Sequence, residues 1–159
     1  MNNNELNKAY DKALELLNIA PHTEKMLSTK LYKKQFSKKT ISEVIEILKN
    51  DNLINDEYFA EIYADNLFKY KKIGPLKVLI KLKEKGINDN SANTIIKKTM
   101  QNNGGEYEII KRYIQKNSIQ IRRILEKNEL DKIKLKLKNS GFNYHTIITA
   151  VNNLQDILE

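Results

Sequence analysis

The sequence contains no cysteine and no tryptophan, and it has only two prolines and five glycines. Without cysteine there can be no disulfide framework, no thiolate chemistry and no cysteine-ligated metal site. No stretch approaches about 18 uncharged apolar residues, so we expect no membrane span. The first residues, MNNNELNKAYDKALELLNIAP, have neither the basic region nor the apolar segment of a signal peptide. The expected location is therefore the cytoplasm.

Catalytic motifs are missing as well. The sequence has no HExxH, Walker or GxSxG pattern, and its acidic residues are mostly isolated or lie at expected helix starts. The two histidines, His22 and His145, are far apart in sequence, and we expect each to have a local capping or surface role. We therefore predict that the protein is not an enzyme and uses no cofactor or metal.

Positive charge is abundant. The 159 residues carry a formal net charge of +8, with a pI near 9.4. Residues 25–39 contain lysines and no acid, residues 69–98 and 111–138 are strongly basic, and residues 43–65 are mainly acidic. A basic excess favours nucleic acid or an acidic partner surface. A generally lysine-rich composition is the alternative explanation.

An internal repeat determines how the stretch 131–138, DKIKLKLK, should fold. Its alternation of aliphatic residues and lysines is, taken alone, typical of a half-buried strand. However, three segments align: LSTKLYKKQFSKKTISEVIEIL from Leu27, VLIKLKEKGINDNSANTIIKKT from Val78 and IKLKLKNSGFNYHTIITAVNNL from Ile133. In each, a leucine follows the first aliphatic residue after four positions, which is helical spacing. The repeat therefore predicts a helix over 131–138.

A second helix follows in each aligned segment. It begins at a polar residue suited to an N-cap, namely Ser37, Asn88 or Asn143. Apolar or small residues then recur at the fourth, seventh and eighth positions, which is one face of a helix. Before the cap, Gly86 and Gly141 occupy the place where a preceding helix ends with positive φ.

A third helix is expected ahead of each pair, at residues 7–17, 56–70 and 106–116, with a longer connection at 117–128. The predicted fold is all-α, with three tandem three-helix repeats forming an elongated, curved molecule. We place the repeats at residues 1–54, 55–103 and 104–159. Because one such unit cannot bury its apolar face alone, the repeats should stack in sequence. We expect a monomer.

Four segments, in order, resemble motifs of the RecX family. They are HTEKMLSTKL (22–31), LINDEYFAEIY (53–63), IGPLKVLIKLKEKGI (73–87) and KLKLKNSGFNYHTI (134–147). The resemblance extends from about residue 9 to 154. It implies a regulator of the RecA recombinase in DNA repair, homologous recombination and the SOS response. Such a protein lies in the groove of the RecA–ssDNA filament and inhibits ATPase activity, strand exchange and filament growth.

Some positions depart from the family pattern. Ala20 and Met26 stand where the family commonly has arginine and glutamate, and Lys81 replaces an acid. Tyr58 and Ser140 each replace an arginine. These changes affect the transfer of partner contacts from the family but leave the apolar framework intact.

Lysines in the repeated helices form the candidate contact surface. In the helix opened by Gly74 and Pro75, the lysines recur every four residues and are expected to form one stripe opposite the apolar face. The full set of predicted contact residues is Lys77, Lys81, Lys85, the matching Lys30, Lys34, Lys38, Lys132 and Lys136, and the fork-shaped donors Arg112, Arg122 and Arg123. An ordinary solvated face is the alternative.

Two further clusters have a structural and a functional interpretation. The sequence Asn55-Asp56-Glu57 either caps a helix or docks on a basic partner, and Phe59 and Ala60 after it are expected in the core. LFKYKKIG (67–74) interleaves aromatic residues and lysines, which either completes an apolar face or stacks single-stranded bases.

Two other functions remain open at this point. One is a helical module that binds single- or double-stranded DNA and acts by coating it. The other is a helical scaffold for a different acidic partner.

Overall fold

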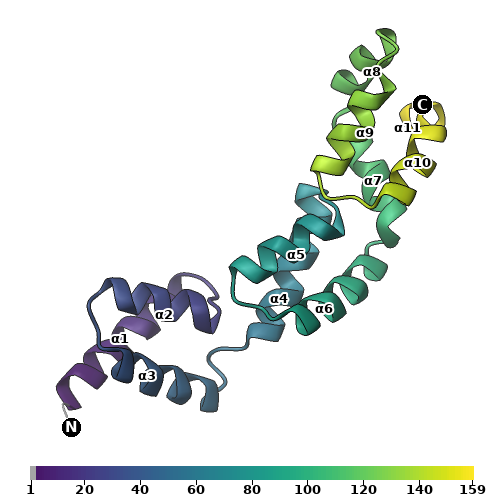
Figure 1. The fold of residues 1–159 in the computed structure, drawn as a ribbon. Helices are drawn as coiled ribbons and strands as arrows, with labels where there is room; N and C mark the ends of the chain where they lie inside the picture. Colours follow the sequence, from purple (N-terminus) through teal and green to yellow (C-terminus); the bar gives the residue numbers. More distant parts are fainter. Residues whose placement is uncertain (1–2) are drawn as a thin grey trace.

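The computed structural model describes residues 3–159, which form an elongated, curved array of helices without a strand in that range (Figure 1). The first group of helices is α1 (Asn3–Ile19), α2 (Glu24–Lys33) and α3 (Lys38–Asn50). The second is α4 (Asp56–Asn66), the short π-helix η1 (Leu67–Lys71), α5 (Pro75–Glu84) and α6 (Asp89–Asn102). The third is α7 (Gly105–Lys116), α8 (Ser118–Glu126), α9 (Leu130–Asn139), α10 (Tyr144–Asn152) and α11 (Leu154–Leu158).

The all-α repeat architecture is confirmed. Residues 131–138 lie within α9, where Ile133 and Leu137 are fully buried as an i, i+4 pair. The exact repeat boundaries stay a prediction, although they coincide with the connections α3–α4 and α6–α7.

Capping follows the expected pattern in the first two groups. The Ser37 side chain accepts a hydrogen bond from the Thr40 amide at 3.2 Å, and Asn88 accepts from the Ser91 amide at 2.9 Å. At the third cap the chemistry differs, because Asn143 donates its backbone and side-chain N–H groups to the Glu106 carboxylate. The start of α10 is therefore bound to Glu106 of α7, and Asn143 makes no side-chain cap of its own helix.

The third group differs from the prediction in one element. The stretch 117–128 was expected to be a connection, but most of it is helix α8, and its Ile121 is fully buried. Ile121, Ile124 and Leu125 have helical spacing and pack into the core, which is why this insertion folds. Neither α8 nor the short α11 has a counterpart in the first two groups.

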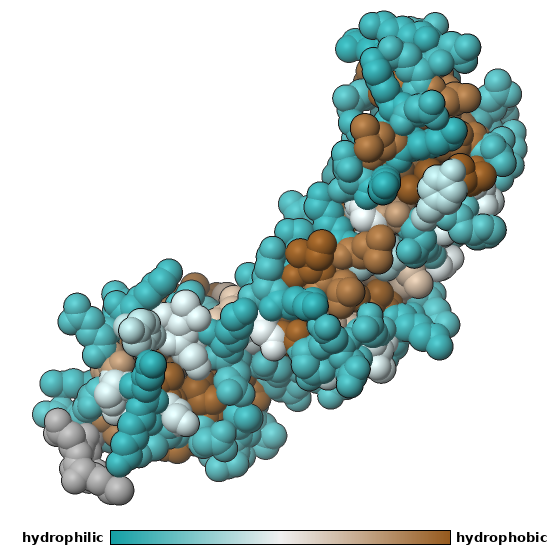
Figure 2. Space-filling model, in the orientation of Figure 1, coloured by the Kyte–Doolittle hydropathy of each residue, from teal (hydrophilic) through white to brown (hydrophobic). Residues whose placement is uncertain are grey.

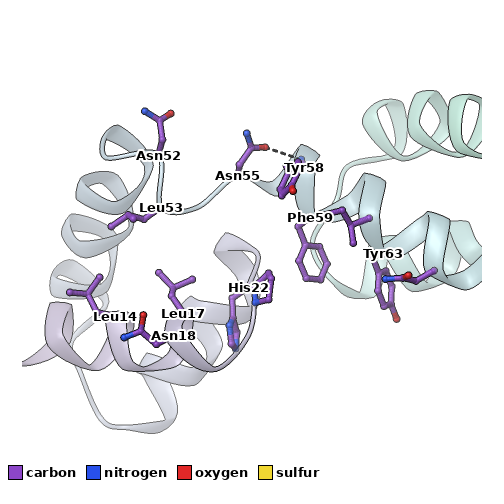
Figure 3. Close-up of a pocket in the computed structure, with 13 residues that line it drawn as sticks. Leu14, Leu17, Asn18, His22, Asn52, Leu53, Asn55, Tyr58, Phe59 and Tyr63 are labelled. Carbon is purple, nitrogen blue, oxygen red and sulfur yellow. Dashed lines mark hydrogen bonds between the residues drawn. The ribbon is translucent and has the colours of Figure 1, made fainter.

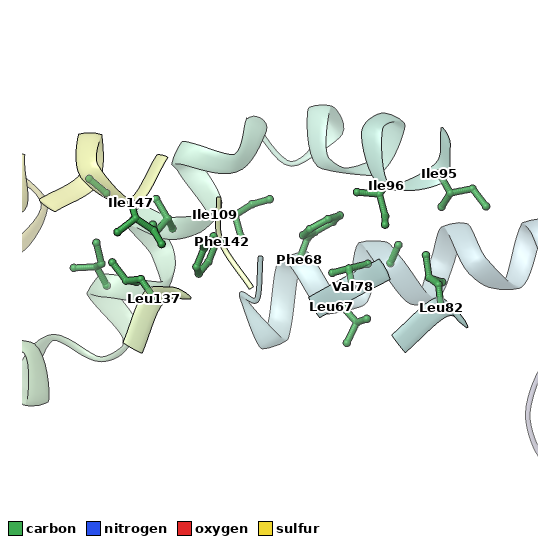
Figure 4. Packing of buried hydrophobic residues seen from close by; sticks show 14 of the residues in the cluster. Leu67, Phe68, Val78, Leu82, Ile95, Ile96, Ile109, Leu137, Phe142 and Ile147 are labelled. Atoms are coloured by element: carbon green, nitrogen blue, oxygen red, sulfur yellow. The ribbon is translucent and has the colours of Figure 1, made fainter. Parts of the chain in front are cut away.

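The buried side chains form two separate clusters. One lies wholly within the first group: Ala9, Ala13, Leu27, Leu31, Ile41, Val44, Ile45, Leu48 and Ile54. The other runs without interruption from Ala60 to Ile157 through the second and third groups. Figure 4 shows Phe68, Ile109 and Phe142 of this cluster where the two groups meet. The first group is therefore a separately packed unit, whereas the second and third share one core.

A hydrogen bond between equivalent positions of the repeat connects the first group to the second and the second to the third. The Thr23 hydroxyl donates to the Lys85 carbonyl oxygen at 2.6 Å, and the Gly74 amide donates to the Ser140 carbonyl oxygen at 2.8 Å. Thr23 and Gly74 precede α2 and α5 at matching positions of the repeat, and Lys85 and Ser140 end α5 and α9 likewise. Both junctions therefore join equivalent positions of the repeat, although the first uses a side-chain donor and the second a backbone donor.

Candidate partner-binding surface

The first helix of each repeated pair, namely α2, α5 or α9, lies along one edge of the array. Figure 1 shows α2, α5 and α9 following one side, with α3, α6 and α10 along the other. We call the predicted lysines on or beside α2, α5 and α9 the basic edge: Lys30, Lys34, Lys38, Lys77, Lys81, Lys85, Lys132 and Lys136. The three in the first group, Lys30, Lys34 and Lys38, are all exposed.

Three lysines from two groups converge between α5 and α9. Lys77, Lys132 and Lys136 line one shallow depression of about 430 Å³, together with Tyr113 and Leu135. The amino group of Lys136 donates to the Gln120 side chain at 2.5 Å, and that of Lys132 pairs with Glu129 at 2.6 Å. Exposed pairs of this kind contribute little to stability, so these cations can exchange their partners for a carboxylate or phosphate.

The stripe on α5 differs from the expectation at its far end. Because successive helix residues are about 100° apart, a row of every fourth residue rotates about 40° per step around the axis. Lys85 therefore falls beside the core face, where it is half-buried and its amino group lies 5.8 Å from the Tyr63 ring centre. The residue opposite the buried Val78 and Leu82 is Ile80.

The arginines lie on α7 and α8. The Arg112 guanidinium donates to the Asn103 carbonyl oxygen at 2.7 Å, closing the junction of α6 and α7, and Arg122 donates to the Leu158 carbonyl oxygen. Arg123 is exposed. Arg112 and Arg122 thus have structural partners, and a role of any of the three in partner binding stays a prediction.

A groove between the first two groups was not foreseen from the sequence. It has a volume of about 550 Å³, and Figure 3 shows Leu17 and His22 facing Phe59 and Tyr63 of α4 across it. Phe59, expected in the core, is only half-buried and stacks on Tyr63 with ring centres 5.6 Å apart. Leu53, which is exposed, also lines this groove.

The histidines have different environments. His22 is only 4% exposed and its Nδ1 lies 2.7 Å from the Ala20 carbonyl oxygen, so it is a local structural residue but not a surface one. His145 is exposed in the first turn of α10.

The acidic cluster at the start of α4 belongs to a joint. Asn55 caps the helix, as predicted, by accepting from the Tyr58 amide at 2.9 Å. Asp56 accepts from the Glu24 amide at 2.8 Å, and its burial there raises the pKa of its carboxyl group. Glu24 pairs with Lys49 at 3.1 Å, and this hydrogen bond raises the pKa of Lys49. The cluster therefore connects the first two groups.

The aromatic–lysine segment is mostly structural. Phe68 is fully buried, so of the two interpretations the completion of an apolar face holds for this residue, while Tyr70 is exposed. Lys69 pairs with Asp65 at 2.9 Å. Burial alone raises the pKa of Asp65, but hydrogen bonds from Lys69 and Asn103 outweigh it and lower that pKa below its usual value.

Among residues 3–159 there is no group of three or more histidine and acidic side chains that could hold a metal ion. Within the same residues, every helix is too short or too polar to cross a membrane.

These features define a class of protein: a tandem array of three-helix repeats with lysines along one edge. A family model described as "RecX, first three-helix domain" matches residues 9–48. The regulatory protein RecX of Clostridium acetobutylicum is 32% identical over 134 residues, covering 84% of this chain and 60% of that protein. Its Clostridium perfringens counterpart is 32% identical over 156 residues, covering 94% of this chain and 70% of that protein.

A solved structure shows the same fold. The crystal structure of RecX from Lactobacillus salivarius superposes with a TM-score of 0.79 at 28% identity, covering 96% of this chain and 97% of the other. The chain belongs to the RecX family of regulatory proteins. It spans about 60% of the length of the Clostridium acetobutylicum relative.

Proposed function

We propose that this chain regulates the RecA recombinase as an inhibitor, by lying in the groove of the RecA–ssDNA filament. In this role it slows ATP hydrolysis and strand exchange and limits filament growth. It acts as a monomer in the cytoplasm and performs no catalysis of its own.

The observation that carries the proposal is the basic edge on an elongated repeat array. An extended partner with acidic protein surface and bound phosphates presents complementary charge along its length, and the equivalent helices α2, α5 and α9 each carry lysines of the basic edge. Membership of a family whose proteins are named regulatory protein RecX supports the regulatory role.

The test is the ATPase rate of the cognate RecA preassembled on single-stranded DNA that offers a large excess of binding sites. We expect inhibition when this protein is present at a small fraction of the RecA concentration. Inhibition that requires enough protein to coat the DNA would instead support competition for phosphate.

The high positive charge favours one second candidate, a module that coats single- or double-stranded DNA. Binding driven by phosphates weakens with log[salt] by about 0.7 per neutralised phosphate on single strands. A protein interface should lose less affinity over the same range of salt. A salt titration of binding to the filament and to bare DNA therefore separates the two functions.

Variants in the first group give a clean test of the basic edge. Lys30, Lys34 and Lys38 are exposed, whereas Lys77 contacts the Asn139 carbonyl oxygen and Lys85 lies beside Tyr63. Replacing the first three together by glutamine should weaken filament binding and leave helicity unchanged. Unaltered binding would place the contact surface elsewhere.

A further inference from the structure

Two large aliphatic side chains point away from the core at matching positions of successive repeats. Ile80 lies two residues after the buried Val78, and Leu135 lies two residues after the buried Ile133. A displacement of two residues is about 200° around a helix, so each side chain lies on the face opposite the core. Ile80 is 58% exposed and Leu135 is 56% exposed.

Their surroundings combine apolar surface with positive charge. Leu76, one helical turn before Ile80, is exposed as well, and Figure 2 shows apolar surface over α5 among hydrophilic side chains. Leu135 lines the depression in which Lys77 and Lys132 come together. Each aliphatic residue is thus flanked by lysines of the basic edge.

This combination favours a protein partner over a nucleic acid. Phosphate contacts use the lysines alone, and single-stranded bases are held by stacking on exposed aromatic rings. Ile80 and Leu135 supply no ring, and Tyr113 in the depression is half-buried and packs edge-on against Phe142. Protein interfaces, in contrast, bury apolar side chains at the centre and surround them with polar or charged groups. Exposed apolar side chains with a charged rim fit a protein surface that carries carboxylates around an apolar recess.

We propose that Ile80 and Leu135 are the two apolar anchors of the partner-binding face, and that each enters an equivalent recess on an acidic protein surface that repeats along the partner. The proposal rests on the proposed function, because a filament of identical subunits presents such a repeating surface. The first repeat contacts the partner differently. Its matching residue is Thr29, whose hydroxyl donates to the Lys25 carbonyl oxygen of its own helix.

The test compares four full-length chains for binding to RecA filaments preassembled on single-stranded DNA, at one fixed salt concentration. They are the wild type, Ile80→Gln, Leu135→Gln and the double variant. Glutamine is a good helix former, and both positions are outside the core, so the fold is retained. Ile19→Gln is the matched control, because Ile19 is an exposed aliphatic residue at the end of α1.

We expect each single substitution to weaken filament binding about fivefold and the double about 25-fold, since roughly half of each side chain becomes buried. The control should bind like the wild type. Binding to bare single-stranded DNA, measured by fluorescence anisotropy, should be the same for all five chains.

The outcomes separate the two proposals. A wild type that does not bind the filament overturns the proposed function and, with it, these anchors. If the wild type binds and the double variant binds equally well, only the anchors are wrong. An equal loss of affinity for bare DNA would mean that this face serves nucleic acid and would also overturn the proposal.

Discussion

The joint between the second and third groups depends on two glycines packed backbone to backbone. A Cβ atom added at Gly74 would lie 2.2 Å from the carbonyl carbon and oxygen of Gly141. One added at Gly141 would lie 2.5 Å from Lys77 Cβ and 2.6 Å from the Lys77 backbone nitrogen. Gly141 also has a φ of +89°, whereas Gly74 has a φ of −76°. Gly105 provides the control, with a φ of +84° and nothing within 4 Å of its added Cβ.

These differences predict three magnitudes for substitution by alanine. At Gly105 only conformational strain applies, about 1–2 kcal/mol, which a more restricted unfolded chain reduces to about 1 kcal/mol. At Gly74 the clash dominates, because the neighbour is backbone and cannot rotate away. Overpacking and the poorer capping by alanine together cost about 3 kcal/mol. At Gly141 strain and clash combine to about 4 kcal/mol.

The double variant tests whether the two glycines act on one joint. Once the first alanine has separated the α9–α10 turn from α5, the methyl group of the second alanine clashes less with the opposite backbone. We therefore expect the double variant to lose about 4 kcal/mol, which is about 3 kcal/mol less than the sum of the single effects.

Stability is measured by urea unfolding followed by circular dichroism. With a denaturant slope near 2 kcal/mol/M, 3 kcal/mol corresponds to a shift of about 1.5 M in the midpoint. Segment-resolved hydrogen exchange shows which part of the chain is destabilised. The amides of Gly74 and Leu76, which donate to Ser140 and Gly141, should exchange faster in the clashing variants, while those of α1–α3 should not change. Equal losses for Gly105→Ala and Gly141→Ala, or fully additive effects at Gly74 and Gly141, would refute the reasoning.

Three other substitutions test the joints and the core. Phe68→Ala should destabilise the chain by about 3–5 kcal/mol, seen as a lower thermal midpoint, because it empties a fully buried site. Thr23→Val keeps the side-chain volume but loses the hydrogen bonds with the Met26 amide and the Lys85 carbonyl oxygen. It should lower the free energy of unfolding by about 2 kcal/mol and speed amide hydrogen exchange in α2. Thr29→Val is the exposed control. The pKa of Asp65 is lowered in the folded state, so its charged carboxylate stabilises the fold above the unfolded pKa of about 3.9, and this stabilisation is lost as the pH falls through the folded-state pKa. Asp65→Asn should therefore unfold at a lower urea concentration than the wild type at pH 7. The difference between the two should shrink in acid.

The helices follow largely from local sequence. Polar caps such as Ser37 and Asn88, a glycine ahead of Asn88, and apolar residues at helical spacing all act within a few residues of each other. The repeat then corrected the one misleading pattern, the alternation in 131–138. Helix α8 was missed because it is an insertion without a counterpart in the other groups, so comparison of the repeats gave no information on it.

The surface required the tertiary structure. The positions of Lys77 and Lys132 on their helices could be derived from the sequence, but their meeting in one depression depends on how α5 and α9 pack. The contact of Thr23 with Lys85 joins residues 62 positions apart, and no local preference specifies such a pair. The sequence alone determined which faces of the helices are apolar, since helical period and capping are local. Only packing between distant segments decided which exposed residues lie together, because that depends on the fit of backbones and side chains across each joint.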